Sequence, residues 1–338
     1  MNYAQLRLVM ADSGCNLNCS YCLPGHSTAK PPGGQDAICG DKLLAAIGAN
    51  TFSTISIWGG EPFYNYDGFR KVVAFCDHYY PGIPIIVISN GTAFTQAKID
   101  FINKQNLHIT LSHDAYKQSY RGRDFLADAA YREMIGAVNN LAFTTVIHNY
   151  NCDIPSIFVY FENIEKMLAR KLPWAFELFQ LPSADTIRFL PQGKSLMEFA
   201  NSVDFLLEQF AAGHPFAVSA LHKALFNMAS IIDKGNHGNT RCGAETRLTV
   251  TTSGERAYCQ VRAERGDFSF PKAGLPPMCR DCSVRMFCRG ICPNATEGYR
   301  KKMCVIYKLF YAKLGNFLIN LPKTAVNPYF NRVSKIRV

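Results

Sequence analysis

The stretch CNLNCSYC, residues 15–22, places three cysteines close together directly after a short apolar run. Their spacing is C-x3-C-x2-C, and the thiols belong to Cys15, Cys19 and Cys22. Thiolates are the ligands that zinc and iron–sulfur clusters prefer. If three of them hold a four-iron cluster, one iron keeps an open coordination position, which is how a metal centre meets a substrate.

Two other interpretations of this loop stay open on the residues alone. A structural zinc ion takes four ligands, and His26 could supply the fourth. The three thiols could also be free and buried, because free cysteine behaves as a small hydrophobic residue.

The composition is that of a folded chain with neither a secretory signal nor a membrane segment. The chain has 338 residues, of which 48% are hydrophobic, enough for one large domain and a smaller one. It has no apolar run of about 18 residues, so we expect no membrane contact and a cytoplasmic location, in the host cytoplasm if the protein is viral. Its 13 cysteines lie at short intervals, which favours metal binding over disulfides.

The formal net charge is +10, and the chain stays basic after thiolate ligands and cluster cores are counted. Such a charge favours an anionic partner such as nucleic acid, or else reflects a solvated lysine-rich surface. Residues 305–338 are predicted to form one helix followed by a basic tail, to which the same two interpretations apply.

From the start to about residue 213 the sequence alternates between strand-like and helix-like segments. This alternation is typical of βα units around a parallel sheet. Six units predict an α/β fold with a partial (β/α)6 TIM-like barrel, in place of the eight units of a closed barrel. The strands are expected at residues 6–11, 54–60, 83–91, 107–114, 143–151 and 174–181, and the helices at 41–50, 65–80, 95–105, 127–141, 154–170 and 195–212.

A change in the sequence pattern predicts two domains. A further helical segment, residues 219–235, precedes a region where cysteines crowd and helical periodicity is lost. We therefore expect a barrel domain at residues 1–235 and a small cysteine-rich domain at residues 236–338. Within the barrel, WGGEP follows the second strand and ISNGT follows the third, at the edge where ligands bind in parallel α/β folds.

The cysteine loop resembles the signature of the radical SAM superfamily, in which an aromatic residue, here Tyr21, precedes the last cysteine. The GGEP stretch, Gly59 to Pro62, resembles the motif that receives the amino group of S-adenosylmethionine (SAM). Its glycines allow close backbone approach, and Glu61 can accept a hydrogen bond.

The resemblance implies a 4Fe-4S cluster on the three cysteines and SAM on the open iron. One electron would then cleave SAM to methionine and a 5′-deoxyadenosyl radical. A low-potential donor such as flavodoxin or ferredoxin would supply that electron, because the cluster must lie toward the reducing end of the iron–sulfur range.

Other segments resemble parts of the superfamily that hold the SAM ribose and carboxylate. They include Ser112 and Asp114 of LSHD, and Arg121 of YRGRD could pair bidentately with the carboxylate. The sequence identifies no catalytic acid or base. The expected SAM-binding residues are Tyr21, Gly59, Gly60, Glu61, Pro62, Ser89, Asn90, Ser112 and Arg121.

Seven further cysteines stand in order near the C-terminus, in the patterns C-x11-G-x4-C, with Gly254 as the glycine, and C-x2-C-x5-C-x3-C, followed by a last cysteine. This order resembles the SPASM extension of radical SAM enzymes, which holds two auxiliary iron–sulfur clusters. A pair of structural zinc ribbons is the alternative. By the resemblance, the outer cluster takes Cys279, Cys282, Cys288 and Cys304, and the inner one takes Cys242, Cys259 and Cys292 with its fourth ligand unidentified.

Three cysteines remain outside these motifs. Cys39, Cys76 and Cys152 each lie in or beside an expected barrel element, so we expect them to be buried small hydrophobic residues.

The sequence leaves the substrate open between DNA and peptide. The chain is similar in overall character to radical SAM proteins of bacterial viruses, some of which rearrange amino-acyl adducts of thymidine in DNA hypermodification. This implies an isomerase-type reaction on a DNA base, and it fits the basic charge. Modification of a peptide is the alternative, because SPASM enzymes mostly act on peptides.

Two observations refine these alternatives. In sulfatase-maturating enzymes an acidic residue follows the second cysteine of the inner pair, whereas Gln260 follows Cys259 here, so that particular activity is not expected. A non-catalytic electron carrier is the third hypothesis, and the GGEP stretch and the barrel pattern argue against it.

Overall fold

The computed structural model describes residues 2–11, 13–22, 38, 40–178, 184–221, 224–225, 246–270, 277–284, 288, 292 and 295–320. The chain forms two compact units, which are described separately. The expected boundary at residue 235 stays a prediction, because these units follow a different division. The first unit comprises Met1–Thr144, Asn163–Leu172 and Gly243–Pro271, and the second comprises Thr145–Glu162, Pro173–Cys242 and Lys272–Val338.

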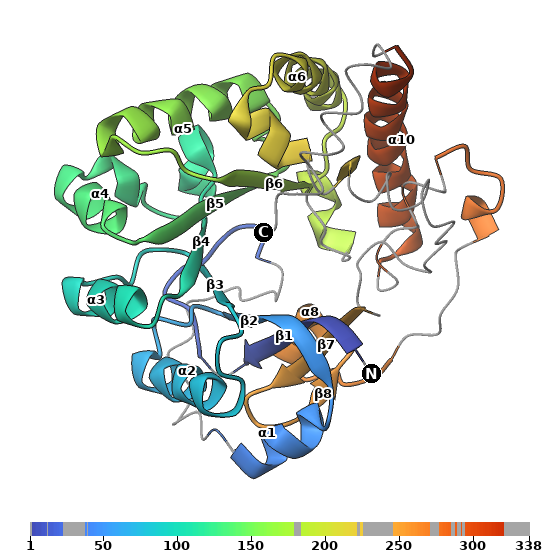
Figure 1. Ribbon diagram of the computed structural model, residues 1–338. Helices are drawn as coiled ribbons and strands as arrows, with labels where there is room; N and C mark the ends of the chain where they lie inside the picture. Colours follow the sequence, from blue (N-terminus) through green and yellow to red (C-terminus); the bar gives the residue numbers. More distant parts are fainter. Residues whose placement is uncertain are drawn as a thin grey trace. The chain divides into compact units, whose positions relative to one another are not determined.

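The first unit is built on a mainly parallel sheet, shown in Figure 1. Its strand order is β5-β4-β3-β2-β1-β7-β8, and only the pairing of β7 with β8 is antiparallel. This sheet confirms the predicted α/β fold with a partial barrel. The strands are β1 (Asn2–Met10), β2 (Thr51–Gly59), β3 (Ile85–Ser89), β4 (His108–Ser112), β5 (Asn140–Ile147), β7 (Arg247–Thr251) and β8 (Arg256–Ala257).

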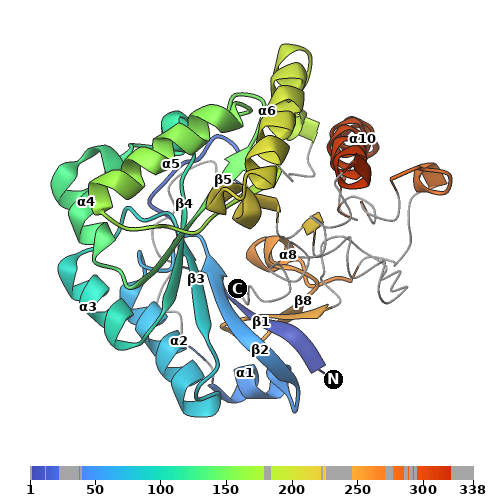
Figure 2. The same ribbon diagram turned by 45° about the horizontal axis from the view of Figure 1, so that its top comes forward.

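The helices of this unit lie on both sides of the sheet around β1, with α8 on one side and α1 on the other (Figure 2). Because both faces are covered, every residue from Leu6 to Met10 is buried. Asn65, Thr95 and Asp128 cap the starts of α2, α3 and α4 with their side chains. The helices are α1 (Gly40–Ile47), α2 (Tyr66–Tyr79), α3 (Gln96–Lys104), α4 (Ala129–Gly136) and α8 (Gln260–Glu264), with short 3-10 helices η1 (Ala115–Tyr120) and η2 (Phe125–Ala127).

Two elements differ from the expected ones. The helix expected at residues 127–141 ends at Gly136. The Arg170 guanidinium caps this end by donating hydrogen bonds to the carbonyls of Gly136, Val138 and Asn139. Strand β5 then begins at Asn140. Strand β7, which pairs in parallel with β1, was not expected, because it lies in the cysteine-rich region.

The second unit holds β6 (Trp174–Leu178) next to the last residues of β5, and it is rich in aromatic contacts. The Trp174 ring packs against Phe158, Phe161 and Phe216, and its Nε1 donates to Thr145 Oγ1 at 2.8 Å. Its helices are α6 (Lys194–Ala211), α10 (Glu297–Asn320), η3 (Ala184–Phe189), η5 (Pro277–Cys279) and the first part of α5 (Ile154–Leu168).

Helix α10 packs on α6, and an ion pair of 2.6 Å joins Lys313 to Asp204. The helix begins at Glu297, earlier than expected, so that Cys304 lies within it. Most of the expected helix 219–235 and the basic tail from residue 321 lie outside the described residues. None of the helices in the described part of the chain is long and apolar enough to cross a membrane.

Candidate functional site

The cysteine loop, residues 13–22, follows β1 and is held by the loops that follow β2, β3 and β4. Because these strands are parallel neighbours, their carboxyl ends meet at one edge of the sheet. Cys15 is buried, and Cys19 and Cys22 are half-buried. The fold therefore brings the separate sequence motifs together around the three cysteines.

The loop after β2 contacts the cysteine loop through its backbone. The Glu61 N–H donates to the Gly14 carbonyl at 2.7 Å, and the Gly60 N–H donates to Ser13 Oγ at 3.1 Å. A Cβ on Gly60 would collide with the Gly14 carbonyl, and a Cβ on Gly59 would collide with the Ser13 hydroxyl. Both glycines of GGEP are thus required by the close approach of two loops.

The Glu61 side chain is fully buried and joins the loop after β2 to the end of β3. Its Oε1 accepts from Ser89 Oγ at 2.8 Å and from the Phe63 N–H at 3.1 Å, and its Oε2 accepts from the Asn90 N–H at 2.6 Å. Burial raises the pKa of Glu61, although these donors and the nearby Lys98 ammonium oppose the rise. Glu61 therefore accepts three hydrogen bonds within the protein, and its contact with the SAM amino group stays a prediction.

The loop after β3 contacts the cysteine loop through side-chain amides. Asn90 Nδ2 donates to Asn16 Oδ1 at 2.9 Å and lies 3.8 Å from Cys15 Sγ. Asn16 Nδ2 in turn donates to Thr92 Oγ1 at 2.8 Å. The Ser89 hydroxyl also accepts from the Gly91 N–H at 3.0 Å, so that Ser89 supports this loop from within.

The loop after β4 holds the second half of the cysteine loop. The Ser20 N–H donates to the Tyr120 carbonyl at 3.1 Å, and Cys19 Sγ lies 3.7 Å from the Arg121 carbonyl. The Tyr21 hydroxyl donates to the Asp114 carboxylate and accepts from Arg121 Nη1 at 3.3 Å. Tyr21, which the sequence assigned to the signature, therefore anchors the loop to the segment after β4.

Buried charges surround Cys19 and Tyr21. Burial alone lowers the pKa of Arg121, but Tyr21, Cys19 and Asp114 together raise that pKa above its usual range. Burial raises the pKa of the Cys19 thiol, whereas the Arg121 guanidinium lowers it. Burial also raises the pKa of Cys15. Because metal binding requires thiolates, these thiols would lose their protons as a metal binds.

Two buried donors beside this network lack a hydrogen-bond partner among the described residues, namely Gln118 Nε2 and Arg121 Nε. Gln118 uses its other amide atom, because its Oε1 accepts from the Asp114 N–H at 2.9 Å. Two buried N–H donors without an acceptor suit an anionic group of a ligand. Gln118 is not among the residues expected from the sequence, and its one signal there is its position three residues before Arg121.

The remaining expected residues lie at the same edge of the sheet. Ser112 is the last residue of β4 and pairs with Thr144 of β5. Pro62 is buried next to Glu61 in the loop after β2. All nine expected SAM-binding residues therefore lie at this edge of the sheet, on the cysteine loop, on the loops after β2, β3 and β4, or at the ends of these strands.

Three of the cysteines expected to hold the outer auxiliary cluster lie close enough to the fourth, Cys304, to affect its pKa. Burial, together with the nearby thiols of Cys288, Cys279 and Cys282, raises the pKa of Cys304 to about 11. Cys304 lies on α10, whereas Cys279 ends η5. The fold of this unit thus places Cys304 near Cys279 and Cys282, the two cysteines of the CxxC stretch.

The other cysteines divide between described and undescribed parts. Cys259 precedes α8 as its N-cap residue, whereas Cys242, Cys39 and His26 lie outside the described residues. Cys76 and Cys152 are buried, which confirms the expectation for both. In the part of the chain that the structure describes, no three His, Cys, Asp or Glu side chains are grouped so that they could hold a single metal ion.

The donor set nevertheless suits a cluster with an open iron. Three cysteine thiols on one loop are the ligand type that iron–sulfur clusters use. Among the described residues, Gln118 Nε2 on η1 and Arg121 Nε directly after it are donors without a partner, and the backbone of η1 contacts the same loop.

Comparison with known proteins identifies the segment that carries this site. Residues 13–147 match the Radical SAM superfamily. The match covers less than half of the chain, and together with the fold it supports the expectation of an enzyme. No curated protein sequence matches the chain.

The matched segment stands within a fold that is similar to solved structures over nearly the whole chain. Native anSMEcpe with bound AdoMet and the Kp18Cys peptide has a TM-score of 0.67 and 19% identity, covering 96% of this chain and 99% of that one. Native anSMEcpe with bound AdoMet has a TM-score of 0.67 and 18% identity, covering 98% and 100%. At these identities the likeness shows the fold.

The variant Gly60→Ala tests the close approach of the two loops. Its methyl group would collide with the Gly14 carbonyl and push the cysteine loop away, so we expect a loss of about four iron atoms per chain after anaerobic reconstitution. Iron analysis measures the loss. Gly40→Ala is the matched control, because nothing lies within 4 Å of a Cβ there. Equal iron content in the two variants would contradict the interpretation.

Proposed function

We propose that this radical SAM enzyme binds SAM at the cysteine loop, cleaves it reductively, and abstracts a hydrogen atom from a peptide. Cys15, Cys19 and Cys22 would hold a 4Fe-4S cluster. When bound, the reduced cluster supplies the electron that cleaves SAM to methionine and a 5′-deoxyadenosyl radical. The electron would come from a low-potential carrier such as flavodoxin or ferredoxin.

The docking of three loops on the cysteine loop is the observation that carries this proposal. Arg121 Nε and Gln118 Nε2 are buried donors without a partner among the described residues, so they can bind the methionine carboxylate of SAM. The Gly59–Pro62 stretch lies against Gly14 and leaves room only for backbone at that contact. Glu61, Ser89 and Asn90 would act together by fixing the positions of the loops after β2 and β3.

The C-terminal cysteines would hold two auxiliary clusters. The influence of Cys279, Cys282 and Cys288 on the pKa of Cys304 supports the outer cluster. The inner cluster, with Cys242, Cys259 and Cys292, rests on the sequence pattern. These clusters would pass on an electron from the substrate radical or bind the substrate directly.

A peptide is the substrate class that the comparisons favour. The anSMEcpe structure with the Kp18Cys peptide shares the fold across 96% of this chain. The DNA interpretation, an isomerase-type rearrangement of a thymidine adduct, is supported by the net charge of +10 and by the overall resemblance to radical SAM proteins of bacterial viruses. We therefore place peptide modification first and DNA modification second.

Cysteine variants separate cleavage of SAM from the later steps. Cys15→Ala, Cys19→Ala and Cys22→Ala should abolish 5′-deoxyadenosine formation from SAM and dithionite, because each removes a ligand of the cluster at which SAM binds. Cys304→Ala should leave part of this cleavage but uncouple it from substrate. Chromatography of 5′-deoxyadenosine measures both effects. Equal loss in all four variants, with circular dichroism unchanged, would show that the two sets of cysteines do not have separate roles.

Variants of the two free donors test the carboxylate site. Arg121→Met and Gln118→Leu should each raise the KM for SAM, by roughly 10- to 100-fold, because a charge-assisted or buried hydrogen bond to the ligand is lost. Initial rates of 5′-deoxyadenosine formation give the KM. Arg123→Met is the control, because the Arg123 side chain is 79% exposed and pairs with Asp128 at the surface. An unchanged KM in Arg121→Met and Gln118→Leu would remove the site from the proposal.

The substrate class can be decided by stimulation of SAM cleavage. Anaerobic protein is incubated with SAM and dithionite, and with either a library of cysteine- and serine-containing peptides or hypermodified phage DNA. We expect peptides to stimulate 5′-deoxyadenosine formation and to change in mass. Stimulation by DNA alone, with salt-dependent duplex binding, would favour the DNA interpretation instead.

A further inference from the structure

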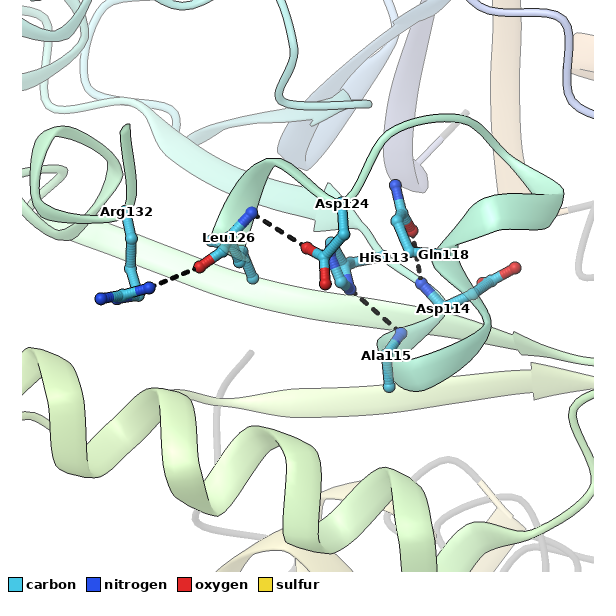
Figure 3. Close-up of polar contacts among 7 residues, drawn as sticks. All are labelled: His113, Asp114, Ala115, Gln118, Asp124, Leu126 and Arg132. Carbon is cyan, nitrogen blue, oxygen red and sulfur yellow. Dashed lines mark hydrogen bonds and ion pairs between the residues drawn. The ribbon is translucent and has the colours of Figure 1, made fainter. Parts of the chain in front are cut away.

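His113 follows β4 and occupies a fully buried position beside the loop that holds Tyr21. Its Nδ1 accepts from the Ala115 N–H at 3.0 Å, so the ring proton of the neutral imidazole lies on Nε2. Nε2 lies 3.1 Å from Asp124 Oδ1, to which it donates. Figure 3 shows His113 between Ala115 and Asp124.

The surroundings of His113 fix its ring plane. The rings of Phe125 and Phe143 meet the imidazole edge-on, with centroids at 5.1 Å and 6.3 Å. Asp124 is held in turn, because its Oδ1 also accepts from the Leu126 N–H at 3.0 Å. The charged groups that face this imidazole are Asp124, Asp114 and Arg121, and burial lowers the pKa of His113.

Ala115 has an unusual backbone conformation. Its φ is +52°, in the left-handed region that residues with a Cβ rarely adopt, and the residue is buried. The hydrogen bond from its N–H to His113 therefore holds a strained residue in place.

The left-handed backbone at Ala115 directs the preceding residue, Asp114, toward the cysteine loop. Asp114 lies between His113 and Ala115, and its carboxylate is fully buried. That carboxylate accepts from the Tyr21 hydroxyl, and Tyr21 accepts from Arg121. The Asp114 N–H donates to Gln118 Oε1 and so orients the side-chain amide of Gln118. The Nε2 of this amide has no partner among the described residues. The direction of Asp114 thus decides the positions of both proposed carboxylate donors.

The same histidine contact elsewhere in the chain does not produce this backbone. His148 Nδ1 accepts from the Tyr150 N–H at 3.2 Å, and His214 Nδ1 accepts from the Phe216 N–H at 3.3 Å. Neither Tyr150 nor Phe216 has a positive φ. The left-handed residue is therefore particular to the turn at His113.

We propose that His113 is a positioning residue for the SAM site, which holds Ala115 in its left-handed conformation and thereby directs Asp114 at Tyr21 and Arg121. This inference rests on the proposed function, because it assumes that Arg121 and Gln118 bind SAM. By this proposal a buried imidazole, which is not among the expected SAM-binding residues, contributes to the affinity for SAM.

Two substitutions of His113 separate its two contacts. The Asn side chain places an oxygen near the position of Nδ1, so His113→Asn keeps an acceptor for the Ala115 N–H and loses Asp124. The Gln side chain reaches the position of Nε2, so His113→Gln keeps Asp124 and loses the acceptor. We expect the KM for SAM to rise about tenfold in His113→Gln and only about twofold in His113→Asn, with kcat changing less than the KM in both.

A glycine at position 115 provides the decisive rescue. Glycine adopts a positive φ without a penalty, so it needs no support from His113. The double variant His113→Gln/Ala115→Gly should therefore recover a KM within about twofold of Ala115→Gly alone. His214→Gln is the matched control, because His214 makes the same turn contact and pairs with Glu162, and it should leave the KM for SAM unchanged.

Hydrogen exchange provides a readout that does not depend on SAM cleavage. In the full-length, cluster-loaded protein, His113→Gln should speed amide exchange in peptides covering residues 13–22 and 113–122, and Ala115→Gly should reverse the change. If the wild type forms no 5′-deoxyadenosine, the proposed function fails, and this exchange pattern still tests the support of Ala115. Equal effects of His113→Asn and His113→Gln, or failure of Ala115→Gly to rescue, would overturn the inference.

Discussion

The backbone contact between Gly14 and the Gly60–Glu61 peptide is the constraint on which the site depends. The Glu61 N–H donates to the Gly14 carbonyl at 2.7 Å, and Gly60 has no room for a side chain. Because β1 and β2 are parallel neighbours with Met10 opposite Gly59, their loops leave the sheet side by side. The register of the two strands thus brings the loops into backbone contact, and the glycines permit that approach.

Around this contact the site is built from buried polar groups that hold one another. The Glu61 carboxylate links the loops after β2 and β3, and the Asp114 carboxylate links the loop after β4 to Tyr21. A buried charge is costly unless it is paired or hydrogen-bonded, so each of these side chains favours a single arrangement of its loop. The free donors of Gln118 and Arg121 are the exception, and a buried N–H without a partner costs roughly 1–3 kcal/mol. A ligand that accepts from both would recover this energy.

Much of the fold could be predicted from the sequence because its signals are local. Helices α2, α3, α5 and α6 have apolar residues at helical spacing and were expected within a few residues of their ends. Two misses have tertiary causes. Helix α4 ends where Arg170, more than 30 residues away, donates to the carbonyl of its last residue, Gly136, and to that of Val138. Strand β7 is defined by pairing with β1, and its short buried sequence gives no clear alternation.

The sequence by itself determined which residues the cysteine loop and the GGEP stretch contain, and hence the prediction of a cluster that binds SAM, because the spacing of Cys15, Cys19 and Cys22 is fixed by covalent order. Only the tertiary structure decided how the other residues serve it. Glu61 accepts hydrogen bonds within the protein, Gln118 presents a free amide, and His113 supports a left-handed alanine. These roles depend on hydrogen bonds between loops that parallel strands bring together and on a backbone angle, neither of which is expressed in the spacing of residues along the chain.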